Sequence, residues 1–452
     1  SFSWYTSTNF IVHGITFLSL PLFTRLLSTD NFGKASLFNS WVAIITIFIG
    51  LNVDASVGRA KLDFPERFNQ FCSSITFLSL SIFSVFFLFI LILQHHFSYL
   101  IGFPKHIVAL LAIAAFCSFI KNLFLTKKRF EYHYKKASAL SILFSISSVI
   151  LSIPLIFAFN NHDAYIGRVL GQHLIIIFFA CCILLTLIKK RCLIKIEYWK
   201  YAICLSVPLI LHNISSIING QLDKIVINYY LGDSPTGIYS FAYSIGMIAK
   251  ILKDSFFQAW TPWFYRHMSN KNHSQIIKRA TDIKNIYSVI FISVALISPE
   301  LVKIMSSKDY WSGIVLLPWI FLAYYFEFLA SFEAYSHLYH KKTFIVSIIS
   351  LTTAVLNIIL NIVLIPSYGI IAAAISTALT FLVYAILIYL SQNVIQKKSV
   401  FRLSFYTEKF WIIGFSLFIL IFFQDSFLIR LTTIFIITSI FGYNLKKSFY
   451  SQ

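Results

Sequence analysis

Charged residues are scarce in this chain of 452 residues. They make up 12% of it, whereas ordinary globular domains carry about 25%. Acidic residues are scarcer still: 17 Asp and Glu stand against 37 Lys and Arg, for a net charge of +20. The six cysteines show no metal-ligand spacing. These shortages exclude a soluble domain, a disordered chain and a disulfide-stabilised secreted domain, and they predict neither a metal nor a cofactor.

Apolar residues take the place of the missing charges. They form 58% of the chain, 48 of them Phe, and the mean hydropathy is +0.78. Because a spanning helix needs about 20 apolar residues, the sequence predicts an all-α polytopic membrane protein with about 14 transmembrane helices. The predicted spans are Tyr5–Phe23, Ala35–Val57, Phe71–Leu93, Ile107–Leu125, Ala137–Phe159, Tyr165–Ile188, Tyr201–Asn219, Gly237–Trp260, Ile283–Ile304, Gly313–Tyr335, Thr343–Ile365, Ile370–Leu390, Phe410–Phe423 and Phe427–Tyr443.

The positive charge is distributed unevenly over the connections between these spans. With the N-terminus in the cytoplasm, 27 of the 37 basic residues fall in cytoplasmic connections and six in the opposite ones. This asymmetry follows the positive-inside rule and predicts that both termini are cytoplasmic. Thirteen spans, without the short thirteenth segment, would place the C-terminus outside. Since topology explains the charge, nucleic acid is not an expected partner.

An internal repeat divides the chain. Shifting it by 204 residues superimposes five residues of the first connection on identical residues of the second half: Leu27, Gly33, Ser36, Ser40 and Ile44 on Leu231, Gly237, Ser240, Ser244 and Ile248. We therefore expect two homologous six-helix bundles, residues 1–200 and 201–396, and a two-helix C-terminal extension, 397–452. Parallel six-span repeats are a recurring transporter architecture, with the site between the halves.

Ionisable residues within or beside the spans are the candidate site. Each needs a partner or a wet cavity, because a charge at the bilayer centre is costly. The candidates for binding an anionic substrate, such as a diphosphate, are Arg25, Arg168, Lys224, Lys250 and Lys253, and those for ion coupling or gating are Asp54, Asp223 and Glu327. Lys250 and Asp254 have the i,i+4 spacing of a helical ion pair, which would leave Lys253 as the free cation. For the carboxylates, a structural ion pair is an equal alternative.

Several short motifs carry a family resemblance. They are Pro21, Thr24 and Arg25 followed by Phe32-Gly33; Gly50-Leu51 with Ala55; Leu222-Asp223-Lys224; Trp260 with Pro262; and Pro366 with Tyr368-Gly369. In this order they resemble bacterial polysaccharide flippases, the O-antigen or Wzx-type transporters of the multidrug/oligosaccharidyl-lipid/polysaccharide exporter superfamily. Arg168 matches no family motif.

The resemblance implies a function in the bacterial inner membrane. The protein would move an undecaprenyl-diphosphate-linked oligosaccharide from the cytoplasmic to the periplasmic leaflet by alternating access, without catalysis. Its partners would be that substrate, membrane lipids, a coupling ion (proton or sodium) and other polysaccharide assembly proteins. Charged lumen residues of the family correspond to Asp223, Lys250 and Lys253.

Three other functions remain as alternatives. A multidrug antiporter of the same superfamily would show mainly acidic lumen residues, whereas cations are at least as numerous here. A peptidoglycan-precursor flippase has the same layout of fourteen spans. A membrane glycosyltransferase, polymerase or acyltransferase needs catalytic groups on an exposed loop, and no carboxylate cluster stands out on the short outward connections.

Overall fold

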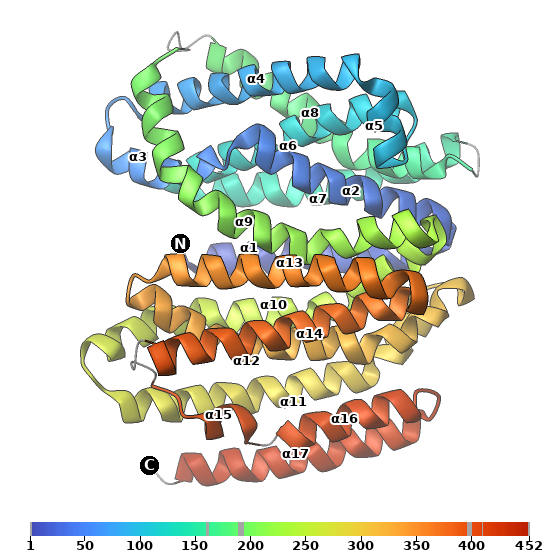
Figure 1. Cartoon of the computed structure of the whole chain (residues 1–452), viewed down its shortest axis with the longest axis vertical. Coiled ribbons are helices and arrows are strands. Elements are labelled where there is room, and N and C mark those ends of the chain that lie inside the picture. Colours follow the sequence, from blue (N-terminus) through green and yellow to red (C-terminus); the bar gives the residue numbers. More distant parts are fainter. Residues whose placement is uncertain (1, 160–161, 189–193, 396–399, 409, 451–452) are drawn as a thin grey trace. The chain divides into compact units, whose positions relative to one another are not determined.

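The computed structural model describes residues 2–159, 162–188, 194–395, 400–408 and 410–450, and side chains within 7–439 except 207–213, 216 and 394–395. These residues form helices joined by short connections (Figure 1). The chain divides into two compact units, unit 1 (Ser1–Thr236) and unit 2 (Gly237–Gln452). An all-helical chain is therefore confirmed. The division by sequence repeat, 1–200, 201–396 and 397–452, stays a prediction.

Unit 1 contains six long helices before its last one. Its elements are α1 (Phe2–Leu26), α2 (Thr29–Gly50), η1 (Val53–Ser56), α3 (Val57–Asp63), α4 (Phe68–Ile92), α5 (Gln94–Ile101), α6 (Lys105–Phe130), α7 (Tyr134–Ala158), α8 (Ala164–Ile188) and α9 (Ile196–Leu231). Helix α2 packs against α6, α8 and α9, while α1 packs against α7.

Small residues allow the closest helix contacts in unit 1. Gly167 and Gly171, four residues apart on α8, lie against α7, and a Cβ at either would come within 2.4 Å of α7 atoms at Leu155 or Ser152. This is the small-xxx-small packing of membrane helices. Gly50 likewise faces Phe119 of α6, 2.4 Å from where a Cβ would be. These glycines set how near α7 and α6 approach their neighbours.

Helix α2 is displaced from the span predicted for it, Ala35–Val57. It starts at Thr29, where the side chain of Ser28 accepts a hydrogen bond from the backbone N–H of Asn31, and it ends at Gly50. Leu51 and Asn52 then take φ values of 45° and 54°. Left-handed backbone stops the helical hydrogen-bond ladder, so Asp54 lies beyond the end of α2, in η1.

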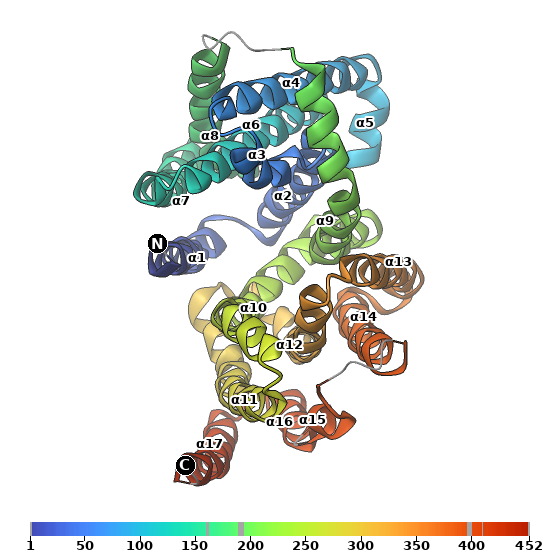
Figure 2. The ribbon, with the colours of Figure 1, turned by 90° about the vertical axis from the view of Figure 1, so that its left-hand side faces the viewer.

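Unit 2 repeats the plan of long antiparallel helices. Its elements are α10 (Asp233–Ser269, beginning at the end of unit 1), α11 (His273–Met305), η2 (Lys308–Leu316), α12 (Leu317–Tyr339), α13 (Thr343–Tyr368), α14 (Ile370–Leu390), η3 (Ser391–Ile395), α15 (Leu403–Thr407), α16 (Phe410–Phe422) and α17 (Phe427–Tyr450). Helix α14 packs against α12 and α13 (Figure 2).

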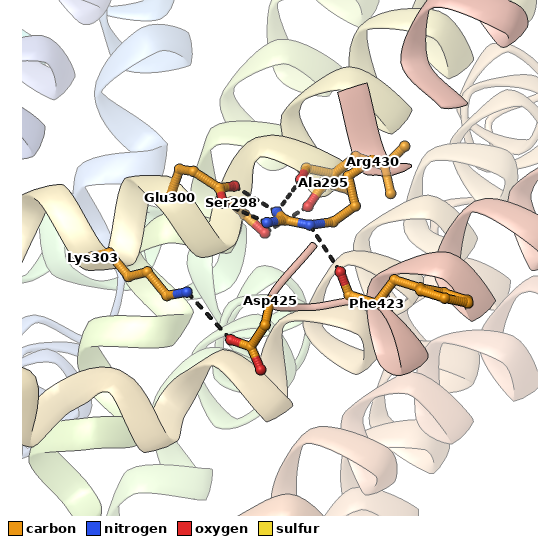
Figure 3. Close-up of polar contacts among 8 residues, drawn as sticks. Ala295, Ser298, Glu300, Lys303, Phe423, Asp425 and Arg430 are labelled. Carbon is orange, nitrogen blue, oxygen red and sulfur yellow. Dashed lines mark hydrogen bonds and ion pairs between the residues drawn. The ribbon is translucent and has the colours of Figure 1, made fainter. Parts of the chain in front are cut away.

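The two C-terminal helices are attached to α11. Arg430 of α17 is 1% exposed and forms a two-pronged ion pair with Glu300 of α11. It also donates to the backbone oxygens of Leu296, at 2.7 Å, and Phe423, at 3.2 Å (Figure 3). Nearby, Lys303 and the exposed Asp425 approach to 3.4 Å.

The number of spans is supported in part. Ten described helical segments are long and apolar enough to cross a membrane, and they correspond to predicted spans two to six and nine to thirteen. Four other predicted spans fall on α1, α9, α10 and α17. Helices α9 and α10 have 36 and 37 residues and carry Asp223, Lys224, Lys250, Lys253 and Asp254. The chain is a multi-pass membrane protein.

Candidate functional site

A charge cluster with a buried lysine at its centre lies in unit 2, between α10 and α12. The ammonium of Lys253 is 2.5 Å from a carboxylate oxygen of Glu327 and 3.1 Å from one of Asp254. The side chains of Lys253 and Glu327 are 8% and 18% exposed. The expectation that Lys253 is free and Asp254 pairs with Lys250 is therefore wrong. Glu327, on another helix, offers Lys253 a second carboxylate that the i,i+4 rule could not reveal.

Buried tyrosines are present on α11 and α12, the second of which carries Glu327. Tyr287 is fully buried and donates to the backbone oxygen of Ala249 at 3.1 Å. Tyr325 and Ser288 share a hydrogen bond of 3.1 Å. The second oxygen of Glu327 is buried and has no hydrogen-bond partner among the described residues. Lys253 faces two carboxylates, and the charge of Lys250 also acts on Glu327, so the cluster contains two cations and two carboxylates and is formally neutral.

A polar cavity of about 360 Å³ lies in unit 1, between α2, α6 and α9. Asn39 and Thr46 line it from α2, Asn52 and Asp54 from the segment after α2, and Asn122 from α6. Thr46 of α2 and Asp54 of η1 thus line the same cavity, although the helix ends before Leu51.

Asp54 is the titratable group of this cavity. Burial raises the pKa of its carboxyl above the ordinary 3.8, and a backbone hydrogen bond opposes this only in part. Such a carboxyl takes up a proton at a higher pH than an exposed one. The geometry therefore allows proton uptake at Asp54, and the open cavity lets water or an ion reach it.

Two neighbouring residues of α2, Asn39 and Ser40, form polar contacts with α8 and α9, and Asn39 also lines the cavity. Asn39 donates to Gln172 at 2.9 Å and lies 3.2 Å from His173. The next residue of α2, Ser40, donates to Gln221 of α9 at 2.9 Å. His173 and Gln221 were not predicted as site residues. Uncharged polar residues in apolar segments give only a weak signal, because most of them join helices.

The remaining predicted cations of unit 1 occupy different surroundings. Arg168 lies over the ring of Phe23, 3.6 Å from its centroid, and donates to the hydroxyl of Ser152 at 2.9 Å. Arg25 is exposed in the last turn of α1. Lys224 donates to Gln221 at 3.3 Å.

His212, Ser216, Asn219 and Asp223 share one face of predicted span seven at helical spacing, and the structure describes only part of this polar stripe. Asp223 is 2% exposed, whereas the side chains of His212 and Ser216 lie outside the described residues. Lys250, partly exposed on α10, is one helical turn from Lys253 and Asp254. Within their own units, the structure brings Lys253 together with Glu327.

The ion pair of Glu300 and Arg430 was missed by the sequence reasoning. Arg430 was placed within a span but given no partner. A search for opposite charges inside the spans would have found Glu300, because two buried charges in a membrane require each other.

The comparisons with known proteins identify the class. Residues 1–268 match the family described as polysaccharide biosynthesis protein, and the chain belongs to this family. A protein of Haloferax volcanii described as a probable low-salt glycan biosynthesis flippase, Agl15, is 23% identical over 388 residues, 83% of this chain and 79% of that protein. Protein 1 of the Lsg locus of Haemophilus influenzae is 22% identical over 269 residues, or 57% of this chain; the match spans 63% of that relative's length.

A solved structure shows the same fold. The lipid II flippase MurJ, in an inward closed conformation, superimposes with a TM-score of 0.72 over 100% of both chains, at 17% identity. The chain therefore has the fold of MurJ.

Proposed function

We propose that this protein is a flippase that moves an undecaprenyl-diphosphate-linked oligosaccharide, such as an O-antigen repeat unit, across the bacterial inner membrane by alternating access. The family membership and the flippase relative support this substrate class. The observation that carries the proposal is the buried Lys253–Glu327 pair, in which an ammonium group lies against a carboxylate of a neighbouring helix.

The proposed layout completes the fold with fourteen spans and both termini in the cytoplasm. Two six-helix bundles, residues 1–200 and 201–396, precede the extension 397–452. Ten apolar helical segments and the long helices α1, α9, α10 and α17 support this count. The basic residues favour the orientation, since 27 of 37 fall on the proposed cytoplasmic side.

The proposed site assigns one role to the cations and another to the carboxylates. Lys253 binds the diphosphate by charge-assisted hydrogen bonds, while the other cations attract it: Arg25, Arg168, Lys224 and Lys250. When the diphosphate binds the ammonium of Lys253, the carboxylate of Glu327 loses its partner. Neutralisation of this carboxylate by a proton or a sodium ion then lowers the free-energy cost of keeping it buried. In unit 1 the proposed ion-coupling role of Glu327 belongs to Asp54 and Asp223. Exchange of partners at Lys253 would thus couple ion and substrate.

Two other activities are less well supported. Export of cationic drugs calls for a mainly acidic site, whereas the proposed site residues include five cations and three carboxylates. A glycosyltransferase or polymerase is not favoured either, because the relative Agl15 is described as a probable flippase and the solved structure with the same fold is that of a flippase.

The test removes both charges of the buried pair and takes the Lys253 partner only from Asp254, whose side chain is 49% exposed. Replacing both residues, Lys253→Met with Glu327→Met, keeps similar volumes, and such replacements of buried pairs are often neutral for stability. We expect normal membrane levels but a loss of surface polysaccharide of about tenfold or more, since each charge-assisted hydrogen bond contributes roughly 1.5–3 kcal/mol. Lipid-linked repeat units should accumulate on the cytoplasmic leaflet of a strain with no second flippase.

The matched control is the other buried ion pair of unit 2. Glu300→Met with Arg430→Met removes the same charges from α11 and α17 and should leave export unchanged. Normal export by the Lys253/Glu327 double variant would remove this pair from the site. Normal polysaccharide display after deletion of the whole gene would overturn the proposed function.

A further inference from the structure

A second polar cavity lies in unit 1, at the end that the basic connections assign to the cytoplasm. It has a volume of about 110 Å³ and lies between α4, α6 and α8. Cys72 and Thr76 line it from α4, Lys127 and Lys128 from α6, and Thr186 from α8. None of these residues belongs to the proposed transport site, so this cavity requires a separate explanation.

The cavity carries an excess of positive charge. Lys128 donates to Glu131 at 2.7 Å, and the ammonium of Lys127 is 3.7 Å from the same carboxylate. The side chains of Lys127 and Lys128 are only 9% and 23% exposed. Two lysines that share one carboxylate leave a net charge of +1 in a poorly hydrated place. Such a charge is costly unless an anion joins it.

Glu131 cannot absorb this excess by itself. Burial favours its neutral form, but the hydrogen bond from Lys128 and the charge of Lys127 hold the pKa of the carboxyl below its ordinary value of 4.5. It is therefore ionised at neutral pH and already counted in the balance. The ammonium groups retain the capacity to donate to a further acceptor, since each has three N–H groups.

The size and position of the cavity indicate which kind of anion it can hold. Pockets for whole small molecules measure about 300–1,000 Å³, so 110 Å³ suits a single tetrahedral group rather than an oligosaccharide. Thr186 on the rim is exposed, as are its neighbour Leu185 and the nearby Cys182 of the last turns of α8. On a membrane helix such apolar exposure faces lipid, and basic pockets between helices on the cytoplasmic side bind anionic head groups.

We propose that this cavity binds the phosphate of an anionic phospholipid of the cytoplasmic leaflet, with Lys127 and Lys128 as its charge partners. The phosphate lies against the two ammonium groups, and the acyl chains follow the exposed apolar side of α8. The hydroxyls of Thr76 and Thr186 now donate to helix carbonyls, at 2.7 Å to Cys72 and Ile183. A hydroxyl rotates readily and can turn its hydrogen to a bound phosphate. The site fixes the lipid beside α4 and α8 and does not depend on the transported substrate.

The test measures lipid binding to the purified full chain with variants of opposite sign. Phosphatidylglycerol in mixed micelles should raise the melting temperature and remain bound in native mass spectrometry, and phosphatidylcholine should do so much less. Lys127→Gln with Lys128→Gln should weaken phosphatidylglycerol binding by about fivefold for each lysine removed. Glu131→Gln should strengthen it, because the local charge then rises to +2. Misfolding cannot produce that gain.

The control removes two charges that lie just outside the cavity. Lys135→Gln with Lys136→Gln takes them from exposed positions at the start of α7 and should leave phosphatidylglycerol binding unchanged. Equal binding by the Lys127/Lys128 variant and the wild type, or weaker binding by Glu131→Gln, would overturn the proposal. Inorganic phosphate is the second probe: stabilisation equal to that by phosphatidylglycerol would assign the site to free phosphate and overturn its assignment to lipid.

Discussion

At the scale of single residues, Asp54 is a carboxylate whose buried position disfavours its ionised form. Burial raises its pKa above 3.8, so the folded protein disfavours the ionised form more than the unfolded chain does. The resulting loss of stability sets in as the pH rises through the ordinary pKa and is complete above the raised one. Asp54→Asn should therefore increase the melting temperature at pH 7, by about 1 °C for each kcal/mol in a chain of this length. The gain should vanish as the pH approaches about 4.

Asp63 provides a control of opposite sign. A hydrogen bond from Tyr201, at 2.6 Å, and one from Arg59, at 3.0 Å, lower the pKa of this exposed carboxyl. Its contribution to stability is present above the ordinary pKa and is lost as the pH falls through the lowered one. Asp63→Asn should thus decrease the melting temperature at pH 7. A decrease with Asp54→Asn at pH 7 would contradict the burial argument.

The candidate site was predictable from the sequence as a set of residues but not as a set of partners. Ionisable residues in apolar helices stand out, so Asp54, Lys253 and Glu327 could be named in advance. Their partners depend on which helices pack together, as the pairing of Lys253 with Glu327, 74 positions apart, shows. Uncharged contributors such as His173 and Gln221 are not distinguishable from ordinary helix contacts before the packing is known.

At the scale of elements, the attachment of α17 to α11 rests on one buried ion pair and one exposed pair (Figure 3). Arg430→Met would leave Glu300 without its cation, and breaking a buried pair in this way costs about 3–5 kcal/mol. We expect a clear drop in the melting temperature, with early proteolysis around residues 423–426. Limited proteolysis and thermal unfolding in detergent measure both effects.

The exposed pair is the comparison for this experiment. Lys303→Gln removes a contact of 3.4 Å to Asp425, whose side chain is 88% exposed. Such pairs contribute about 0–1 kcal/mol, so the melting temperature should hardly change. Replacing both Glu300 and Arg430 by Met should restore most of the stability lost in Arg430→Met. Equal decreases in melting temperature for Lys303→Gln and Arg430→Met would show that the burial of Arg430 adds nothing to the stability of the protein.

The elements themselves followed from hydropathy, and their ends did not. Apolar runs of about 20 residues predicted ten segments that the structure shows as apolar helices. The end of α2 could not be predicted, because Leu51 and Asn52 adopt a left-handed backbone that neither residue type strongly prefers. The close approach of α8 to α7 at Gly167 and Gly171 was present in the sequence as a G-x-x-x-G spacing, but which helix fills the space depends on the fold.

At the scale of the whole molecule, the distribution of basic residues predicts an even number of membrane spans. With 27 basic residues on one side and six on the other, both termini should be cytoplasmic. A fluorescent protein that folds only in the cytoplasm should therefore glow when fused after residue 452. It should stay dark when the chain is cut after Asp425, in the connection between α16 and α17. Alkaline phosphatase, active only outside the cytoplasm, should give the reverse pattern.

A dark fluorescent fusion at residue 452, together with an active phosphatase fusion there, would mean thirteen spans and an external C-terminus. In that case α16 would not cross the membrane, although the segment Leu403–Phe422 that contains it is apolar enough to do so. Lys446 and Lys447 would then lie outside, against the charge rule that organises the rest of the chain.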